Sequence, residues 1–133
     1  MKRIIVNGTF DIIHQGHIEL LNYAKSLGDY LIVCIDTDTR VSQLKGRGRP
    51  VKNQGERQFI LENIRCVDAV LTFSTDESLE DIIKTYQPDI MVKGSDYKDK
   101  PIVGSQYCKE IIFFDRIEKY ATTKTIQNII ARR

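Results

Sequence analysis

Residues 7–19 read Asn-Gly-Thr-Phe-Asp-Ile-Ile-His-Gln-Gly-His-Ile-Glu and contain both histidines of the chain. This stretch follows a short β-branched run, turns through a glycine and opens an amphipathic helix. A strand that ends in a glycine-containing turn and continues into a helix places free backbone N–H groups and the positive end of the helix dipole at one point, where anions bind. Two imidazoles beside an anion site indicate phosphate chemistry.

The rest of the chain alternates between strand-like and helix-like segments. Continuous apolar runs, typical of strands covered on both faces of a parallel sheet, predict strands at residues 3–7, 30–35, 67–73, 89–93 and 110–115. Helical spacing of apolar residues predicts helices at residues 15–27 before Gly28, at about 37–44, at 56–65, at 75–86 and from Thr122 or Thr123 onward. This order favours an α/β fold, a three-layer sandwich with a Rossmann-like, mostly parallel sheet of about five strands.

Length and composition narrow the class of protein. A chain of 133 residues has the size of one ordinary domain, so we expect a single domain over residues 1–133. A net charge of +2 does not favour a nucleic-acid or membrane surface, and neither partner is expected. Three cysteines without a CxxC spacing are typical of reduced thiols in a cytoplasmic protein. The N-terminal apolar run 4–6 is too short for a signal peptide or a membrane span.

Four polar turns follow the expected strands, at residues 7–17, 36–49, 93–98 and 115–123. Ligands of open α/β sheets bind beyond the carboxyl ends of the strands, so these turns are expected to form the site. Considered alone, the two histidines also suit helix capping or a surface zinc site. The basic loop 45–49 alone also suits a solvated charge run or a nucleic-acid contact.

The motif formed by residues 8–11 and 14–17 resembles the HxGH signature of nucleotidyltransferases in the cytidylyltransferase-like superfamily. Further segments resemble this family in the same order: Leu44–Gly46, Arg49–Val51, Arg57, Arg65–Asp68, Val92–Tyr97 and Thr122–Thr123. The resemblance covers nearly the whole chain. It implies an enzyme that transfers a nucleoside monophosphate from an NTP to a small phosphorylated substrate and releases pyrophosphate, and it implies a homodimer.

Two branches of this superfamily compete. The loop 44–51 together with residues 92–97 resembles the adenylyltransferase domain of ADP-heptose synthases, whose substrates are ATP and a heptose 1-phosphate. Residues 116–118 are closer to bacterial glycerol-3-phosphate cytidylyltransferases, which use CTP. ATP is slightly favoured. The rival from another class is a nucleotide-binding regulatory module without turnover, and retention of both histidines, Lys45 and the double threonine argues against it.

Three residues are expected to be catalytic. His14 and His17 are three apart at a helix start, so their rings can point to the same side and donate to phosphate oxygens. Lys45, on a glycine-flanked loop, can reach the α-phosphate and the incoming phosphate as a mobile charge. No nucleophilic side chain is required, because catalysis of such a transfer is mostly positioning and electrostatic stabilisation.

The resemblance implies the other site residues. Nucleotide contacts are expected from Gly8, Thr9, Phe10, Lys93, Gly94, Asp96, Arg116, Thr122 and Thr123, the last three on the β- and γ-phosphates. Substrate contacts are expected from Asp11, Arg57 and Arg65. The alternatives are loop or metal orientation for Asp11 and structural salt bridges for the two arginines. Mg²⁺ is expected to bridge the phosphates with few protein ligands, and no metal-binding side chain is assigned.

Overall fold

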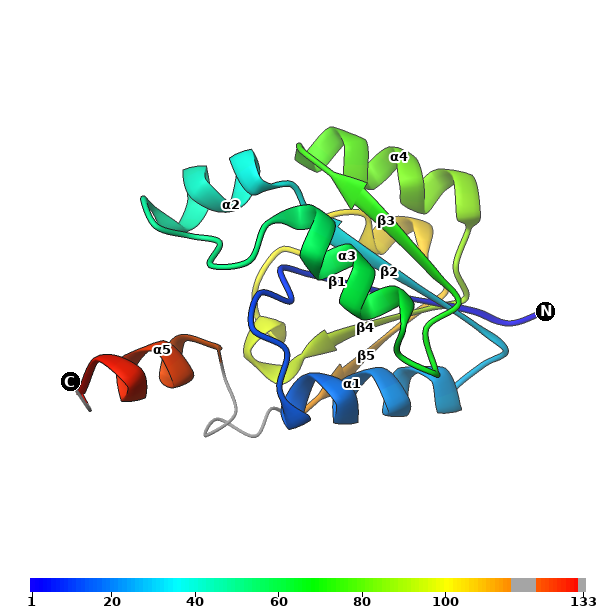
Figure 1. The fold of residues 1–133 in the computed structure, drawn as a ribbon. Coiled ribbons are helices and arrows are strands. Elements are labelled where there is room, and N and C mark those ends of the chain that lie inside the picture. The colour runs from blue at the N-terminus through cyan, green and yellow to red at the C-terminus, as the bar shows by residue number, and fades with distance from the viewer. Residues whose placement is uncertain (116–121, 132–133) are drawn as a thin grey trace.

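The computed structural model describes residues 1–115 and 122–131, with side chains for residues 1–115 and 126–130. Strands and helices alternate along this part of the chain (Figure 1). The strands are β1 (Arg3–Gly8), β2 (Tyr30–Asp36), β3 (Ala69–Phe73), β4 (Ile90–Gly94) and β5 (Glu110–Phe114). The helices are α1 (Gln15–Ser26), α2 (Asp38–Lys45), α3 (Gln54–Glu62), α4 (Asp76–Tyr86) and α5 (Thr122–Ala131), with short 3₁₀ turns η1 (Ser95–Tyr97) and η2 (Ser105–Tyr107).

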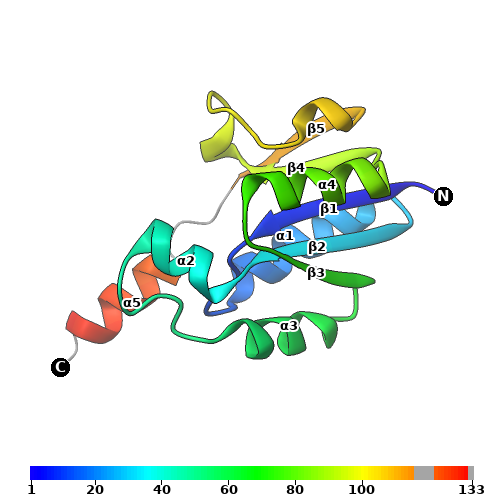
Figure 2. The ribbon, with the colours of Figure 1, turned by 90° about the horizontal axis from the view of Figure 1, so that it is seen from above.

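The strands form one sheet in the order β3-β2-β1-β4-β5, which Figure 2 shows from above. Every strand pair within the described residues is parallel. β1 pairs with β2 from Arg3↔Tyr30 to Gly8↔Ile35, so both strands end at the same level. The Rossmann-like parallel sheet predicted from the sequence is confirmed, and its carboxyl edge collects the turns that follow the strands.

Helices cover both faces of the sheet and give three layers. Alternate residues of β1 divide between two cores: Ile4 and Val6 pack on the side of α1 and α3, and Ile5 packs on the side of α4. In Figure 2, α4 lies in front of the sheet and α1 behind it. This two-sided covering explains why the strands read as continuous apolar runs instead of alternating ones.

Element ends differ from the predictions by a few residues, for local reasons. α3 begins at Gln54 because the Asn53 side chain caps it by accepting from the Glu56 N–H at 2.9 Å. α1 ends at Ser26, and Gly28 is not in the left-handed conformation of a helix stop. It is glycine because an added Cβ would lie 2.8 Å from the Lys2 carbonyl oxygen, at the start of β1.

Other expectations from composition can be compared with the structure. All three cysteines are free thiols. Burial raises the pKa of Cys34 to about 12 and that of Cys108 to about 11, so neither thiol has thiolate character at neutral pH. Within the described residues, no helix combines the length and the apolar character that crossing a membrane requires.

Candidate active site

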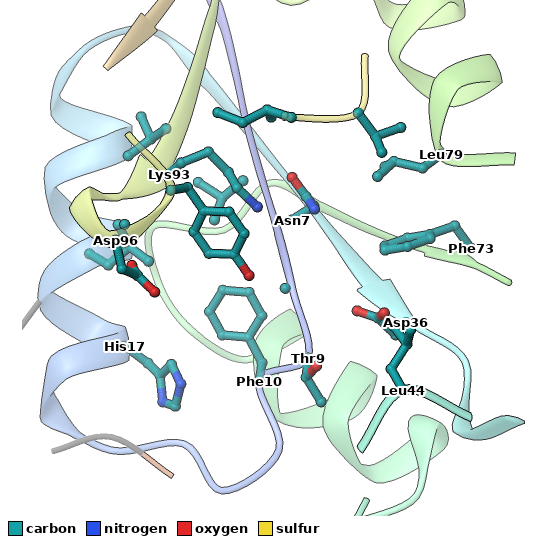
Figure 3. A pocket seen from close by; sticks show the side chains of 18 of the residues that line it. Asn7, Thr9, Phe10, His17, Asp36, Leu44, Phe73, Leu79, Lys93 and Asp96 are labelled. Carbon is teal, nitrogen blue, oxygen red and sulfur yellow. The ribbon is translucent and has the colours of Figure 1, made fainter. Parts of the chain in front are cut away.

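A cavity of about 320 Å³ opens at the carboxyl edge of the sheet (Figure 3). Three of the four predicted turns contribute to its lining. Most residues predicted for catalysis or nucleotide binding line it: Gly8, Thr9, Phe10, His17, Lys45, Lys93, Gly94 and Asp96. The loops that the sequence predicted to meet are therefore brought together, although the role of each residue stays a prediction.

The two histidines cap α1 and stack on each other. The Nδ1 atom of His14 accepts a hydrogen bond from the Gly16 N–H at 3.1 Å, and the Nδ1 atom of His17 accepts one from the His14 N–H at 3.1 Å. Their ring centroids are 3.9 Å apart. Because each Nδ1 is an acceptor, a neutral ring carries its proton on Nε2. A neutral His17 thus carries an Nε2–H donor at the cavity lining, beside a helix N-terminus that already favours an anion, whereas His14 does not line the cavity and its Nε2 atom is buried.

The turn before these histidines is shaped by the close approach of the Phe10 ring to the backbone of Gly8. Phe10 has a positive φ of 50°, which is rare for a bulky residue and marks a constrained turn. Its ring lies 5.2 Å from the His17 ring and so close to Gly8 that an added Cβ there would be 3.1 Å from it. The packing of the Phe10 ring between Gly8 and His17 thus holds the His17 ring in place at the cavity wall.

Lys93 and Lys45 supply cationic groups to the cavity lining in different ways. Lys93 is the last residue but one of β4 and is only 9% exposed, with its Nζ 4.1 Å from the centroid of the Tyr97 ring. Burial lowers the pKa of Lys93, and the carboxylates of Asp36 and Asp96 oppose part of that shift. Lys45 is instead the exposed last residue of α2, followed by Gly46 with a φ of 96°. Its long side chain at a helix end suits the predicted mobile contact with phosphates.

Asp11 has a structural role in place of the predicted substrate contact. Its carboxylate is 2% exposed and accepts from the backbone N–H groups of Val51 and Lys52 at 2.8 and 2.9 Å. Arg49 Nε lies 3.5 Å from the same carboxylate. Asp11 therefore ties the β1–α1 turn to the basic loop after α2, which agrees with the alternative that it orients a loop.

Arg57 is likewise structural, and its assignment to substrate binding is corrected. The side chain is fully buried and is absent from the cavity lining. Its guanidinium donates to the carbonyl oxygens of Lys52 and Thr9 at 3.0 and 2.9 Å, and to the Asp38 carboxylate at 2.9 Å. These contacts occupy its Nε, Nη1 and Nη2 atoms, so Arg57 joins three loops at the edge of the sheet instead of contacting a ligand.

Arg65 is also misassigned, because it lies at the opposite edge of the sheet. It is exposed and follows α3, just before β3 begins. The adjoining Asp68 N–H donates to the carbonyl oxygen of Leu31, near the start of β2.

The remaining predicted contact, Arg116, lies outside the described residues. The backbone of Thr122 and Thr123 begins α5, and the side chains of these two residues lie outside the described part as well.

Several residues lining the cavity were not predicted as site residues. They are Asn7, Asp36, Arg40, Phe73, Leu79, Ile102 and Val103. Asn7, Asp36 and Arg40 lie in turns that the sequence predicts to form the site, but no individual role is predicted for them, and the apolar residues are predicted only as core or loop. The signal present in the sequence is the change from apolar to polar side chains at the carboxyl ends of two buried strands, at Asn7 and at Asp36.

The fold and the cavity define a Rossmann-like α/β domain whose ligand site lies at the carboxyl edge of its sheet. The chain belongs to the cytidylyltransferase-like family, which matches residues 5–128. The family resemblance seen in the HxGH motif is thereby confirmed.

Two curated relatives show how much of a longer protein the chain matches. It is 43% identical over 128 residues to the Bifunctional protein HldE of Helicobacter hepaticus, covering 96% of this chain and 26% of that protein. It is 44% identical over 129 residues to the Bifunctional protein HldE of Nitratiruptor sp., covering 96% and 28%. The chain thus spans about a quarter of the length of these curated relatives.

Solved structures share the fold. A lipopolysaccharide core biosynthesis protein from Thermoplasma volcanium matches with a TM-score of 0.73 at 24% identity, covering 86% of this chain and 98% of that chain. Pantothenate synthetase from Thermus thermophilus matches with a TM-score of 0.63 at 12% identity, covering 99% and 67%. At these identities the likeness concerns the fold alone.

The structural role of Arg57 predicts a large effect on stability. In Arg57→Leu the carbonyl oxygens of Lys52 and Thr9 lose their donor and Asp38 loses its cation, so the free energy of unfolding should fall by about 3 kcal/mol. Arg65→Leu, at an exposed position, should change it by less than about 0.5 kcal/mol. Urea unfolding followed by circular dichroism measures both. Equal stability of the two variants would contradict the structural role.

The buried ammonium of Lys93 predicts a gain in stability on its removal. Lys93→Met should raise the free energy of unfolding at pH 7 by about 1 kcal/mol, because no charge is then desolvated. The folded-state pKa of Lys93 is lowered, so the unfolded chain binds more protons between that pKa and about 10.4, and the advantage of the variant should shrink as the pH rises through this window. Lys100→Met, an exposed lysine 5.5 Å from the same Tyr97 ring, is the control and should show no such gain.

Proposed function

We propose that the chain is a nucleotidyltransferase that transfers a nucleoside monophosphate from an NTP, with ATP favoured, to a sugar phosphate such as a heptose 1-phosphate. The observation that carries this proposal is the pair of stacked imidazoles whose Nδ1 atoms are held by backbone N–H groups at the start of α1. Membership of the cytidylyltransferase-like family supports the reaction class. The match to the HldE proteins and the resemblance to ADP-heptose synthases support ATP and the heptose.

The transfer needs no protein nucleophile. An oxygen of the acceptor phosphate forms a bond to the α-phosphorus of the NTP, while the bond from that phosphorus to the oxygen bridging to the β-phosphate breaks. Pyrophosphate leaves with the electron pair, and no proton has to move. Negative charge grows on the equatorial oxygens and on the leaving group, so preorganised donors lower the barrier. His14 and His17 supply Nε2–H donors, and Lys45 supplies a mobile positive charge.

Mg²⁺ is proposed as the cofactor, and it would neutralise charge on the NTP phosphates. No group of three or more His, Cys, Asp or Glu side chains within the described residues is arranged to hold a metal ion. In the described part of the chain, the carboxylates that line the cavity are those of Asp36 and Asp96. Mg²⁺ commonly takes most of its ligands from phosphates and water, so the proposal assigns no side chain of this chain to it.

We also propose a cytoplasmic homodimer. The free thiols are typical of a reducing compartment. Several large apolar side chains are exposed and could be covered by a second copy, among them Phe59 at 67%, Leu44 at 65% and Ile130 at 59%. Light scattering should give twice the 15.3 kDa mass of the chain, and a monomer at micromolar concentration would contradict the dimer.

Pyrophosphate release tests the reaction. ATP or CTP is combined with heptose 1-phosphate or glycerol 3-phosphate in the presence of Mg²⁺, and ATP with the heptose should react fastest. His17→Ala should slow this pair by about a hundredfold or more, as removal of an oxyanion donor does. Gln15→Ala, which removes an exposed side chain bonded to Glu19 in the same helix turn, is the control and should keep wild-type turnover.

Three other outcomes of this assay would change or overturn the proposed function. Faster release from CTP with glycerol 3-phosphate would replace the favoured reaction by the cytidylyltransferase alternative. Turnover of His17→Ala equal to that of Gln15→Ala would remove this histidine from the mechanism. No pyrophosphate from any of the four pairs would overturn the proposed function.

A further inference from the structure

Three polar side chains stand in a row on one face of the sheet, across strands β2, β1 and β4. The apolar residues Cys34, Ile5 and Met91 of these strands belong to the core on the α4 side. Side chains alternate along a strand, so the residues two positions further on share that face. They are Asp36, Asn7 and Lys93, and we call them the polar row.

The sheet register places Lys93 level with Asn7 and places Asp36 two residues further along β2 than the partner of Asn7. Asn7 pairs with Cys34, and Ile5 pairs with Met91, so two residues later Asn7 stands beside Lys93. All three members of the row line the cavity. Figure 3 shows Asn7 between Lys93 and Asp36, with Phe73 and Leu79 on the side of Asp36. The row is therefore where the apolar α4-side core gives way to the cavity.

Asp36 is a buried carboxylate held from one side. It is 7% exposed, and its Oδ2 atom accepts from Arg40 Nε at 3.1 Å. Arg40 is itself fixed, because its Nη2 atom donates to the exposed Asp76 and its guanidinium lies 5.3 Å from the centroid of the Phe73 ring. Through this charge-assisted hydrogen bond, Arg40 orients the Asp36 carboxylate at the cavity wall.

Asn7 has an acceptor that the described protein leaves unused. Its side-chain oxygen Oδ1 is buried and has no hydrogen-bond partner among the described residues. A buried acceptor without a donor destabilises the folded protein, and such groups in native proteins usually have a partner. Since this residue lines the cavity, a ligand that carries a donor would satisfy it.

The two ends of the cavity therefore prefer opposite chemistry. The end at the start of α1 presents the His17 ring and a helix N-terminus, which favour phosphates. The end at Asp36 and Asn7 presents two acceptors, one of them negatively charged, with Arg40 and Lys93 next to them and the apolar side chains of Phe73 and Leu79 alongside. A carboxylate repels a phosphate but accepts strongly from a hydroxyl group, and apolar walls suit the C–H faces of a sugar.

We propose that Asp36 and Asn7 bind hydroxyl groups of the acceptor, so that this end of the cavity selects the polyhydroxylated part of a sugar or polyol phosphate. The inference rests on the proposed function and adds the residues that choose the acceptor. Bound in this way, the acceptor would have its phosphate toward the histidines and its hydroxyl groups toward β2.

Two carboxylate variants test this selection with a matched control. Asp36→Asn and Asp76→Asn each remove one acidic partner of Arg40, but only Asp36 lines the cavity. Asp36→Asn should raise the KM for heptose 1-phosphate at least tenfold and change the KM for ATP less than twofold. Asp76→Asn should leave both values within twofold of the wild type. Equal effects of the two variants would overturn the proposal, because Asp36 would then act only through Arg40.

Asn7→Val provides a test that does not depend on Arg40. It removes an unsatisfied acceptor from a strand end, so the variant should be at least as stable as the wild type and should still raise the KM for the acceptor. A raised KM for ATP with an unchanged acceptor KM would overturn the proposal. A changed Mg²⁺ requirement in Asp36→Asn, with the acceptor KM unchanged, would assign Asp36 to the metal instead and would also overturn it.

A binding measurement separates failure of this inference from failure of the proposed function. Calorimetric titration of the wild type should show tighter binding of heptose 1-phosphate than of inorganic phosphate, and Asp36→Asn should lose that preference. This result would support the inference even if no pyrophosphate is released, in which case only the proposed reaction fails. Equal affinities of the wild type for the two probes would overturn the inference even if turnover is observed.

Discussion

The hydrogen bonds from two backbone N–H groups to the Nδ1 atoms of His14 and His17 are the contacts on which the site depends. An Asp cap would satisfy the same helix N–H groups, but an ionised carboxylate has no donor to offer a ligand. An imidazole cap accepts with one nitrogen and donates with the other. Helix initiation, ring tautomer and donor direction are therefore set by the same bonds.

The histidine cap can act on a phosphate only because the fold also places basic side chains near it. The strained turn at Phe10 leads the chain from β1 into α1, and Asp11 ties that turn to the basic loop after α2. The buried Arg57 side chain donates hydrogen bonds to the carbonyl oxygens of Thr9 and Lys52 and so links the same two segments. Hydrogen bonds between backbone groups and two buried charged side chains thus fix the turn that leads to His17 and the loop that follows Lys45.

The parts of the site that could be predicted from the sequence are those determined within one element. The histidine pair follows from a three-residue spacing on one helix, and the sheet follows from the apolar runs. Arg57 and Arg65 look equivalent in sequence, but Arg57 lies within α3 and Arg65 lies three residues beyond its end, near the amino ends of β2 and β3. One arginine lies buried beside the turn after β1, and the other lies exposed at the opposite edge. A motif match in the sequence does not show that the two arginines lie at opposite edges of the sheet.

The sequence places Asn7, Asp36 and Lys93 in three turns at the carboxyl edge of the sheet, but only the register of three strands shows that they share one face. Each member interrupts the apolar run at a strand end, where a core residue would have given more stability. Arg40 is shared between Asp36 and Asp76, and Lys93 is the further cation near Asp36. Burial of this lysine is costly even beside the carboxylates of Asp36 and Asp96. Its presence beside Asn7 and Asp36 is explained most simply by a ligand that is anionic at one point and hydroxylated at another.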